Sequence, residues 1–104
     1  MHDPIKFVEN GSVTTPVGFK ACGVTAGLKA SGKADMAMVY SEVPANFAGA
    51  FTSCLFAAAP VLLCRRRVLE SRFIQAIIVN SGNANACTGK TGLDNAAGTC
   101  AAVA

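Results

Sequence analysis

Residues 73–85 of this 104-residue chain read Phe-Ile-Gln-Ala-Ile-Ile-Val-Asn-Ser-Gly-Asn-Ala-Asn, and the first half of this stretch predicts the strongest strand of the fold. Phe73 to Val79 is apolar and rich in β-branched residues, which is typical of a buried strand. Asn80 to Asn85 cannot continue that strand, because asparagine, serine and glycine favour turns. We therefore expect a core strand that ends in a polar loop.

This polar loop is the best candidate for a ligand site. In open α/β sheets, ligands bind just beyond the ends of strands, and the loop offers many hydrogen-bond donors and acceptors. We expect a substrate site to be bordered by Asn80, Ser81, Gly82, Asn83 and Asn85. Alternatively, they are ordinary turn residues that hydrogen-bond their own backbone. The sequence leaves both interpretations open, and not every asparagine need touch a ligand.

The rest of the chain predicts an α/β fold. We expect an extended stretch at Phe19–Lys29, a strand buried on both faces at Asp35–Val43 that Pro44 ends, and a shorter strand at Ala48–Ser53. Two helices are predicted, one over Ala57–Leu69 with Pro60 in its first turn, and one from Thr91 to the end of the chain. The expected order is β-β-β-α-β-α, after an irregular segment at residues 1–15.

Composition limits the size and class of the fold. Apolar residues make up 52% of the chain and charged residues 14%. A chain of this length can bury about 65% of its unfolded surface, enough for one modest core, and this composition excludes intrinsic disorder. The net charge of +3 comes from Arg65, Arg66, Arg67 and Arg72, offset by Glu70. Such a local excess does not support nucleic-acid binding.

Residue types that carry catalysis or bind metals are sparse. The five cysteines include no Cys-x-x-Cys pair, so we expect no metal site and interpret them as reduced, mostly buried small side chains of an intracellular protein. The only histidine, His2, lies in the terminal segment, and the six carboxylates are scattered singly. We expect no cofactor, and no catalytic residue is expected in this chain.

The sequence also allows two other classes of function, a single-span membrane protein and a small nucleotide-binding module. The uncharged stretch Val43–Cys64 is long enough to span a bilayer, but its prolines and polar residues make it a poor membrane helix. The stretch from Gly82 to Thr91 resembles a phosphate-binding loop, with Gly89-Lys90-Thr91 at the start of a helix. Six residues separate Gly82 from Gly89, whereas the motif needs four.

Several stretches together resemble a known family. They are Val13–Ala21, Gly23–Lys29, Asp35–Pro44, Ala48–Thr52, Ala57–Leu62 and, most specifically, Val79–Gly89. In this order they resemble the glutamate N-acetyltransferases of arginine biosynthesis, also called ornithine acetyltransferases. The resemblance extends from about Val13 to Ala104.

The resemblance implies an αββα-type sandwich and transfer of acetyl from N-acetylornithine, or in some members from acetyl-CoA, to glutamate. A precursor of this family cuts itself at an Ala-Thr bond. The freed threonine is the nucleophile, its α-amino group is the base, and a Thr-Gly pair forms the oxyanion hole. The partners implied are the second chain of the cleaved precursor, in a hetero-oligomer, and the substrates N-acetylornithine and glutamate.

This chain lacks the residues that carry catalysis in the family pattern. No threonine here follows an alanine, so the self-cleavage junction is absent. The oxyanion pair and the known substrate ligands also belong beyond Ala104. We therefore expect residues 16–104 to be the N-terminal portion of the acetyltransferase domain, incomplete without its C-terminal remainder and inactive alone. We expect no membrane association, and a cytoplasmic location, or an organelle matrix in a eukaryote.

Overall fold

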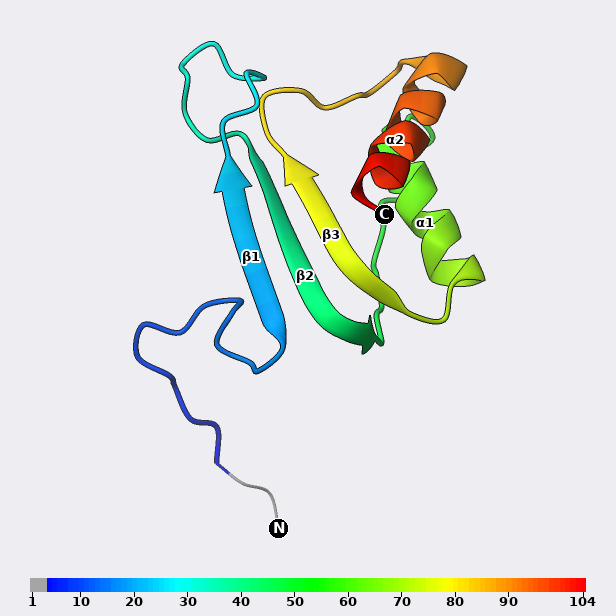
Figure 1. The fold of residues 1–104 in the computed structure, drawn as a ribbon. Coiled ribbons are helices and arrows are strands. Elements are labelled where there is room, and N and C mark those ends of the chain that lie inside the picture. Colours follow the sequence, from blue (N-terminus) through cyan, green and yellow to red (C-terminus); the bar gives the residue numbers. More distant parts are fainter. Residues whose placement is uncertain (1–3) are drawn as a thin grey trace.

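The computed structural model describes residues 4–104 and has the α/β architecture expected from the sequence. In chain order the elements are β1 (Phe19–Val24), β2 (Met36–Ala45), α1 (Ala59–Glu70), β3 (Ile74–Asn80) and α2 (Gly89–Val103). The three strands form one antiparallel sheet in the order β1-β2-β3 (Figure 1). β2 is therefore the central strand, and β1 and β3 are the two edges.

Strand β2 is longer than the sequence suggested. It pairs with β1 from Met36 to Ser41 and with β3 from Met36 to Ala45, with a register irregularity between Tyr40 and Ala45. Inside that irregularity, the Ser41 hydroxyl donates to the Val43 carbonyl at 2.6 Å. Pro44 does not end the strand as expected, because a proline at such an irregularity removes no regular ladder hydrogen bond.

Both helices lie on the β3 side of the sheet, and neither extends over β1 (Figure 1). Pro60 occupies the first turn of α1, as expected, where its missing N–H leaves no intrahelical bond unmade. The sequence placed the start of α2 at Thr91, two residues after the observed start at Gly89. α1 and α2 pack against each other, and the loop after β3 connects the sheet to this helix pair.

The strand predicted at Ala48–Ser53 is wrong, and the observed order is β-β-α-β-α. This segment is irregular in the structure. The Arg65 guanidinium donates to the Thr52 carbonyl at 2.5 Å, so a side chain of α1 occupies an acceptor that a strand would offer to its neighbour. Small residues such as Ala48, Gly49 and Ala50 also have weak strand propensity.

The predicted burial of β2 on both faces is also wrong. Of its ten residues only Ser41 is buried, and all six residues of β1 are exposed. Ala59 is the one buried apolar residue within residues 4–104. Ile77 and Val79 of β3 remain 52% and 55% exposed. The two helices pack mainly against each other beside β3 (Figure 1), so most of the apolar surface of the sheet is left uncovered.

The cysteines follow the same pattern. All five are free, four are exposed, and only Cys100 is half-buried. Their expected burial is therefore wrong for this chain, because the sheet and helices enclose too little volume.

The membrane interpretation is not supported by the elements observed. Val43–Cys64 is divided among the end of β2, an irregular connection and the first half of α1. Within residues 4–104, no helix combines the length and the apolar character that crossing a bilayer requires.

Candidate functional site

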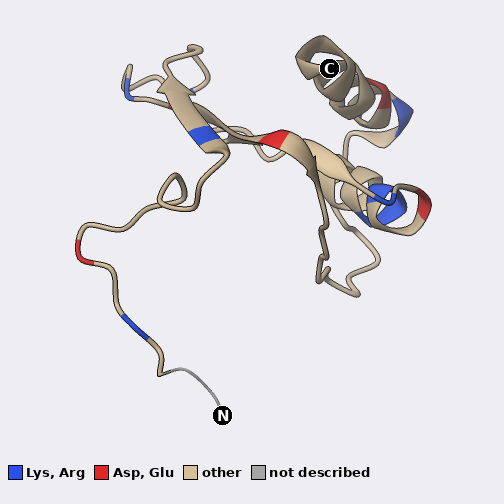
Figure 2. Cartoon of the chain, turned by 60° about the horizontal axis from the view of Figure 1, so that its bottom comes forward, with Lys and Arg blue, Asp and Glu red and all other residues tan. Residues whose placement is uncertain are grey.

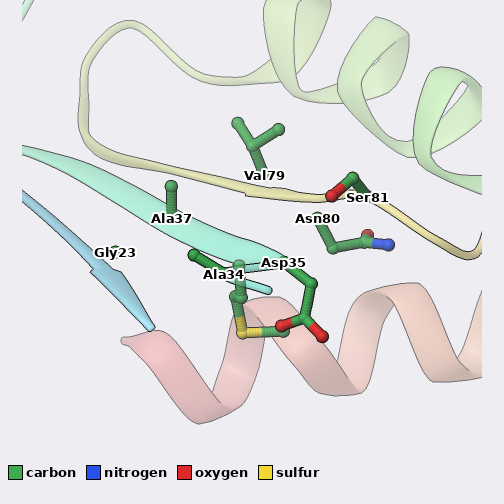
Figure 3. A pocket seen from close by; sticks show the side chains of 8 residues that line it. Gly23, Ala34, Asp35, Ala37, Val79, Asn80 and Ser81 are labelled. Carbon is green, nitrogen blue, oxygen red and sulfur yellow. The ribbon is translucent and has the colours of Figure 1, made fainter. Parts of the chain in front are cut away.

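The polar loop after β3 borders two adjoining hollows at one end of the sheet. The first, of about 190 Å³, is lined by Gly23, Ala34, Asp35, Met36, Ala37, Val79, Asn80 and Ser81. The second, of about 480 Å³, is lined by residues 80–84. Asn80 and Ser81 belong to both. Figure 3 shows Val79 and Ala37 on one side of the sheet and the Asp35 carboxylate pointing to the other.

The structure brings four of the five predicted site residues to the second hollow, namely Asn80, Ser81, Gly82 and Asn83. Asn80 uses its side chain within the loop, because its Nδ2 donates to the Asn83 carbonyl at 2.8 Å. Among the described residues, the Ser81 hydroxyl and the Asn83 side-chain NH₂ group make no hydrogen bond. Ser81 and Asn83 therefore keep polar groups available to a ligand.

Asn85, the fifth predicted site residue, does not line either hollow and has a structural role. Its Nδ2 donates to the Gly92 carbonyl at 2.9 Å, and its Oδ1 accepts from the Thr88 hydroxyl at 2.6 Å. Its backbone carbonyl accepts from the Ala59 amide at 3.2 Å. Asn85 adopts a left-handed φ of 46°, which asparagine tolerates better than most residues. It thus ties the start of α1 to the first turn of α2.

Gly92 makes this junction possible and was missed by sequence reasoning. It is the one buried residue of α2. A Cβ at this position would lie 1.7 Å from Thr88 Oγ1 and 2.6 Å from Asn85 Oδ1. The only signal in the sequence was a glycine within the predicted helix, where it lowers helix propensity relative to alanine.

Asp35 is the second residue that sequence reasoning missed as part of the site. It is only 3% exposed and lies immediately before β2. Its Oδ1 accepts from the Ala26 amide at 2.7 Å, and its Oδ2 accepts from the amides of Leu28 at 2.7 Å and Lys29 at 3.1 Å. A sequence pattern shows a single acidic residue before a strand, and only the folded chain brings these donors to it.

The same hydrogen bonds set the ionisation of Asp35. The amides of Ala26 and Lys29 lower the pKa of this carboxyl below its usual 3.8, and the amide of Leu28 adds to them. Burial acts in the opposite direction but does not outweigh the donors. Asp35 is therefore a carboxylate at neutral pH.

The phosphate-loop interpretation is not supported by the geometry. Lys90 Nζ forms an ion pair with Asp94 Oδ2 at 2.7 Å, one turn along α2, instead of reaching back toward the loop. The lysine that would meet a phosphate is thus engaged within α2.

Charge and metal-binding groups do not gather at the hollows. Figure 2 shows basic residues concentrated on α1, while the sheet carries few charges. Within residues 4–104, no group of three or more histidine, cysteine or acidic side chains is placed to hold a metal ion. His2 lies outside the described residues. The loop therefore presents mainly uncharged hydrogen-bonding groups at the second hollow.

Comparison with known proteins identifies the family. The sequence profile of the ArgJ family matches residues 20–104, most of the chain. The chain belongs to the ArgJ family. A Synechocystis relative, named arginine biosynthesis bifunctional protein ArgJ, is 52% identical over 89 residues. That match covers 86% of this chain and 22% of the relative.

Two solved structures of the ArgJ family share this fold. The Bacillus halodurans arginine biosynthesis bifunctional protein superposes with a TM-score of 0.84 at 43% identity, over 90% of this chain and 49% of that chain. The ornithine acetyltransferase of Mycobacterium tuberculosis, solved with ornithine, gives a TM-score of 0.80 at 44% identity, over 88% and 48%. The chain thus spans about a fifth of the curated relative and about half of each solved chain.

Proposed function

We propose that residues 16–104 form the N-terminal portion of an acetyltransferase of arginine biosynthesis that moves acetyl from N-acetylornithine to glutamate. The observation that carries this proposal is the ArgJ-family match over residues 20–104. The M. tuberculosis structure supports the substrate class, because that protein is named an ornithine acetyltransferase and is complexed with ornithine.

In this proposal the reacting groups lie outside the chain. The nucleophile is a threonine freed by cleavage of an Ala-Thr bond, and its own α-amino group removes the proton. This chain covers 22% of the Synechocystis relative but 49% of the solved B. halodurans chain, so that solved polypeptide is about half as long as the relative. A precursor that is cut into two chains of similar length would give polypeptides about half as long as an uncut relative.

The role proposed for this chain is to form one border of the substrate site. Ser81 and Asn83 supply a hydroxyl and an amide at the second hollow, and both can hydrogen-bond the amino-acid groups of the substrates. The neighbouring Asn80 holds the loop closed through its bond to the Asn83 carbonyl. Asn85 contributes to the site only indirectly, since it fixes the junction of the loop with both helices.

The proposed partner is the remainder of the precursor, in a hetero-oligomer of the two cleaved chains. The uncovered apolar side chains of the sheet, such as Ile77 and Val79, give that remainder a surface on which to pack. A cytoplasmic location, or an organelle matrix in a eukaryote, is part of the proposal. The five free thiols suit a reducing compartment.

A hybrid protein tests this proposal. Residues 16–104 replace the matching segment of the Synechocystis relative, which is 52% identical over the aligned 89 residues. We expect the hybrid to transfer acetyl from N-acetylornithine to glutamate, and the 104-residue chain alone to have no turnover. A hybrid that folds but forms no N-acetylglutamate, while the unmodified relative does, would contradict the proposal.

A further inference from the structure

The buried carboxylate of Asp35 lies where two loops meet at one end of the sheet. One loop, residues 25–29, follows β1, and the other is the polar loop that follows β3. The three backbone amides that donate to Asp35 all come from the first loop. Three donors on one carboxylate fix the position of that loop.

Asp35 also contacts the polar loop directly through its own backbone. The Ser81 amide donates to the Asp35 carbonyl at 2.8 Å, just beyond the last residue of β3. The Asp35 amide in turn donates to the Val24 carbonyl at 3.1 Å, at the end of β1. One residue therefore joins the ends of all three strands.

The two loops also touch through Gly82. Its φ of +90° favours glycine. A Cβ at this position would lie 2.9 Å from Lys29 Cγ and 3.4 Å from the Leu28 carbonyl carbon. Leu28 and Lys29 are two of the residues whose amides Asp35 holds. The loop that Asp35 fixes is thus the surface against which Gly82 rests.

We propose that Asp35 is a positioning residue for the substrate site, acting through loop 25–29 on the backbone at residues 81 and 82. The placement of Ser81 and Asn83 over their hollow then depends on a carboxylate whose oxygens accept from backbone amides. This inference rests on the proposed function for its kinetic consequences, whereas its structural consequence is independent of activity.

Replacing Asp35 with asparagine tests this role most specifically, because asparagine keeps the shape of aspartate. It presents an NH₂ group in place of one of the two acceptor oxygens, and backbone N–H donors face both oxygens. At least one donor of loop 25–29 is then left opposite another donor. The ionised state of Asp35, which its lowered pKa maintains, is what the three amides recognise.

The first experiment measures amide hydrogen exchange in the hybrid protein with Asp35→Asn. We expect exchange in peptides covering residues 24–30 and 80–86 to accelerate about tenfold. Glu42→Gln is the matched control, because Glu42 is an exposed acid on β2 that pairs with Lys20, and it should leave both peptides unchanged. Acceleration confined to residues 24–30 would overturn the proposal.

The second experiment separates substrate binding from turnover. Since the polar loop is proposed to border the substrate while the nucleophile lies outside this chain, we expect Asp35→Asn to raise KM for N-acetylornithine or glutamate about tenfold and to change kcat less than about twofold. A purely structural role would lower the amount of active enzyme, and thus kcat, at unchanged KM. That result would overturn the proposal.

A double-mutant cycle tests the route through Gly82. Gly82→Ala should raise the same KM, and the combined variant should raise it by less than the product of the single effects, because both act on one contact. Gly18→Ala controls for backbone strain, since Gly18 has a similar φ of +92° with no atom within 4 Å of an added Cβ. If the effects of Asp35→Asn and Gly82→Ala on KM simply multiplied, the proposed action of Asp35 through Gly82 would be overturned.

The outcomes distinguish this inference from the proposed function. If the hybrid has no acetyltransferase activity, the proposed function fails, and hydrogen exchange at residues 80–86 still decides whether Asp35 positions the loop. If the hybrid is active and Asp35→Asn leaves exchange and KM unchanged, the positioning role fails alone.

Discussion

Gly92→Ala should destabilise the protein although alanine is the better helix former. The added Cβ would lie 1.7 Å from Thr88 Oγ1 and 2.5 Å from Thr88 Cβ. Alanine has no side-chain torsion that could move this carbon away from either atom. Rotation of the Thr88 side chain moves Oγ1 but not Cβ, so the backbone at the start of α2 must also shift. The hydrogen bonds of Asn85 to Thr88 and to the Gly92 carbonyl are then broken or lengthened.

The magnitude follows from three effects. Loss of the two hydrogen bonds costs about 2 kcal/mol, and overpacking at a buried position costs about 1–3 kcal/mol. The intrinsic preference of a helix for alanine over glycine returns about 1 kcal/mol. We therefore expect the free energy of unfolding to fall by about 2–4 kcal/mol.

Urea unfolding of the hybrid protein, followed by circular dichroism, measures this change. The matched control is Gly98→Ala on the same helix, where an added Cβ meets no atom within 4 Å. That variant should be more stable by about 0.5–1 kcal/mol. If Gly92→Ala were as stabilising as Gly98→Ala, the junction built on Asn85, Thr88 and Gly92 would be refuted.

Three further predictions concern other described residues. The pKa of Asp35 is lowered in the folded protein, so its ionised form stabilises the fold at pH values above the unfolded pKa of 3.8. This contribution is lost as the pH falls through the lower folded pKa. The difference in melting temperature between the parent hybrid and Asp35→Asn should therefore be constant from neutral pH to about pH 5 and shrink below pH 3.8. Asn83→Ala should raise KM about threefold to tenfold at unchanged stability, whereas Asn85→Ala should lower the free energy of unfolding by about 1–3 kcal/mol. If kinetic and urea measurements showed instead that Asn83→Ala lowers stability and Asn85→Ala raises only KM, the roles assigned to these two residues would be contradicted. Lys90→Ala removes only an exposed ion pair and should cost less than about 0.5 kcal/mol, with no ATP-dependent shift in melting for either protein.

Local sequence patterns predicted most of the elements because hydrophobicity and backbone preferences are local properties. The run Phe73–Val79 predicted β3, and Pro60 marked the start of α1. The failure at Ala48–Ser53 has a tertiary cause, since Arg65 occupies the Thr52 carbonyl. The expected burial of β2 failed similarly, because burial depends on what covers a strand as well as on its own residues.

The candidate site was predictable in position but not in detail. The change from apolar residues to asparagine, serine and glycine after Val79 located the loop. Nothing local distinguishes Asn83 from Asn85, and only the folded chain shows that Asn85 bonds to Thr88 and Gly92. Asp35 could not be found because its donors lie six to nine residues away in sequence and converge on it only after folding.

The central claim is that this chain supplies the N-terminal portion of an acetyltransferase. Its most direct test is the formation of N-acetylglutamate from N-acetylornithine and glutamate by the hybrid in which residues 16–104 replace the matching segment of the Synechocystis relative. The claim predicts turnover within about tenfold of the unmodified relative, since substitutions away from the reacting groups rarely cost more than that. A folded hybrid without turnover would contradict it.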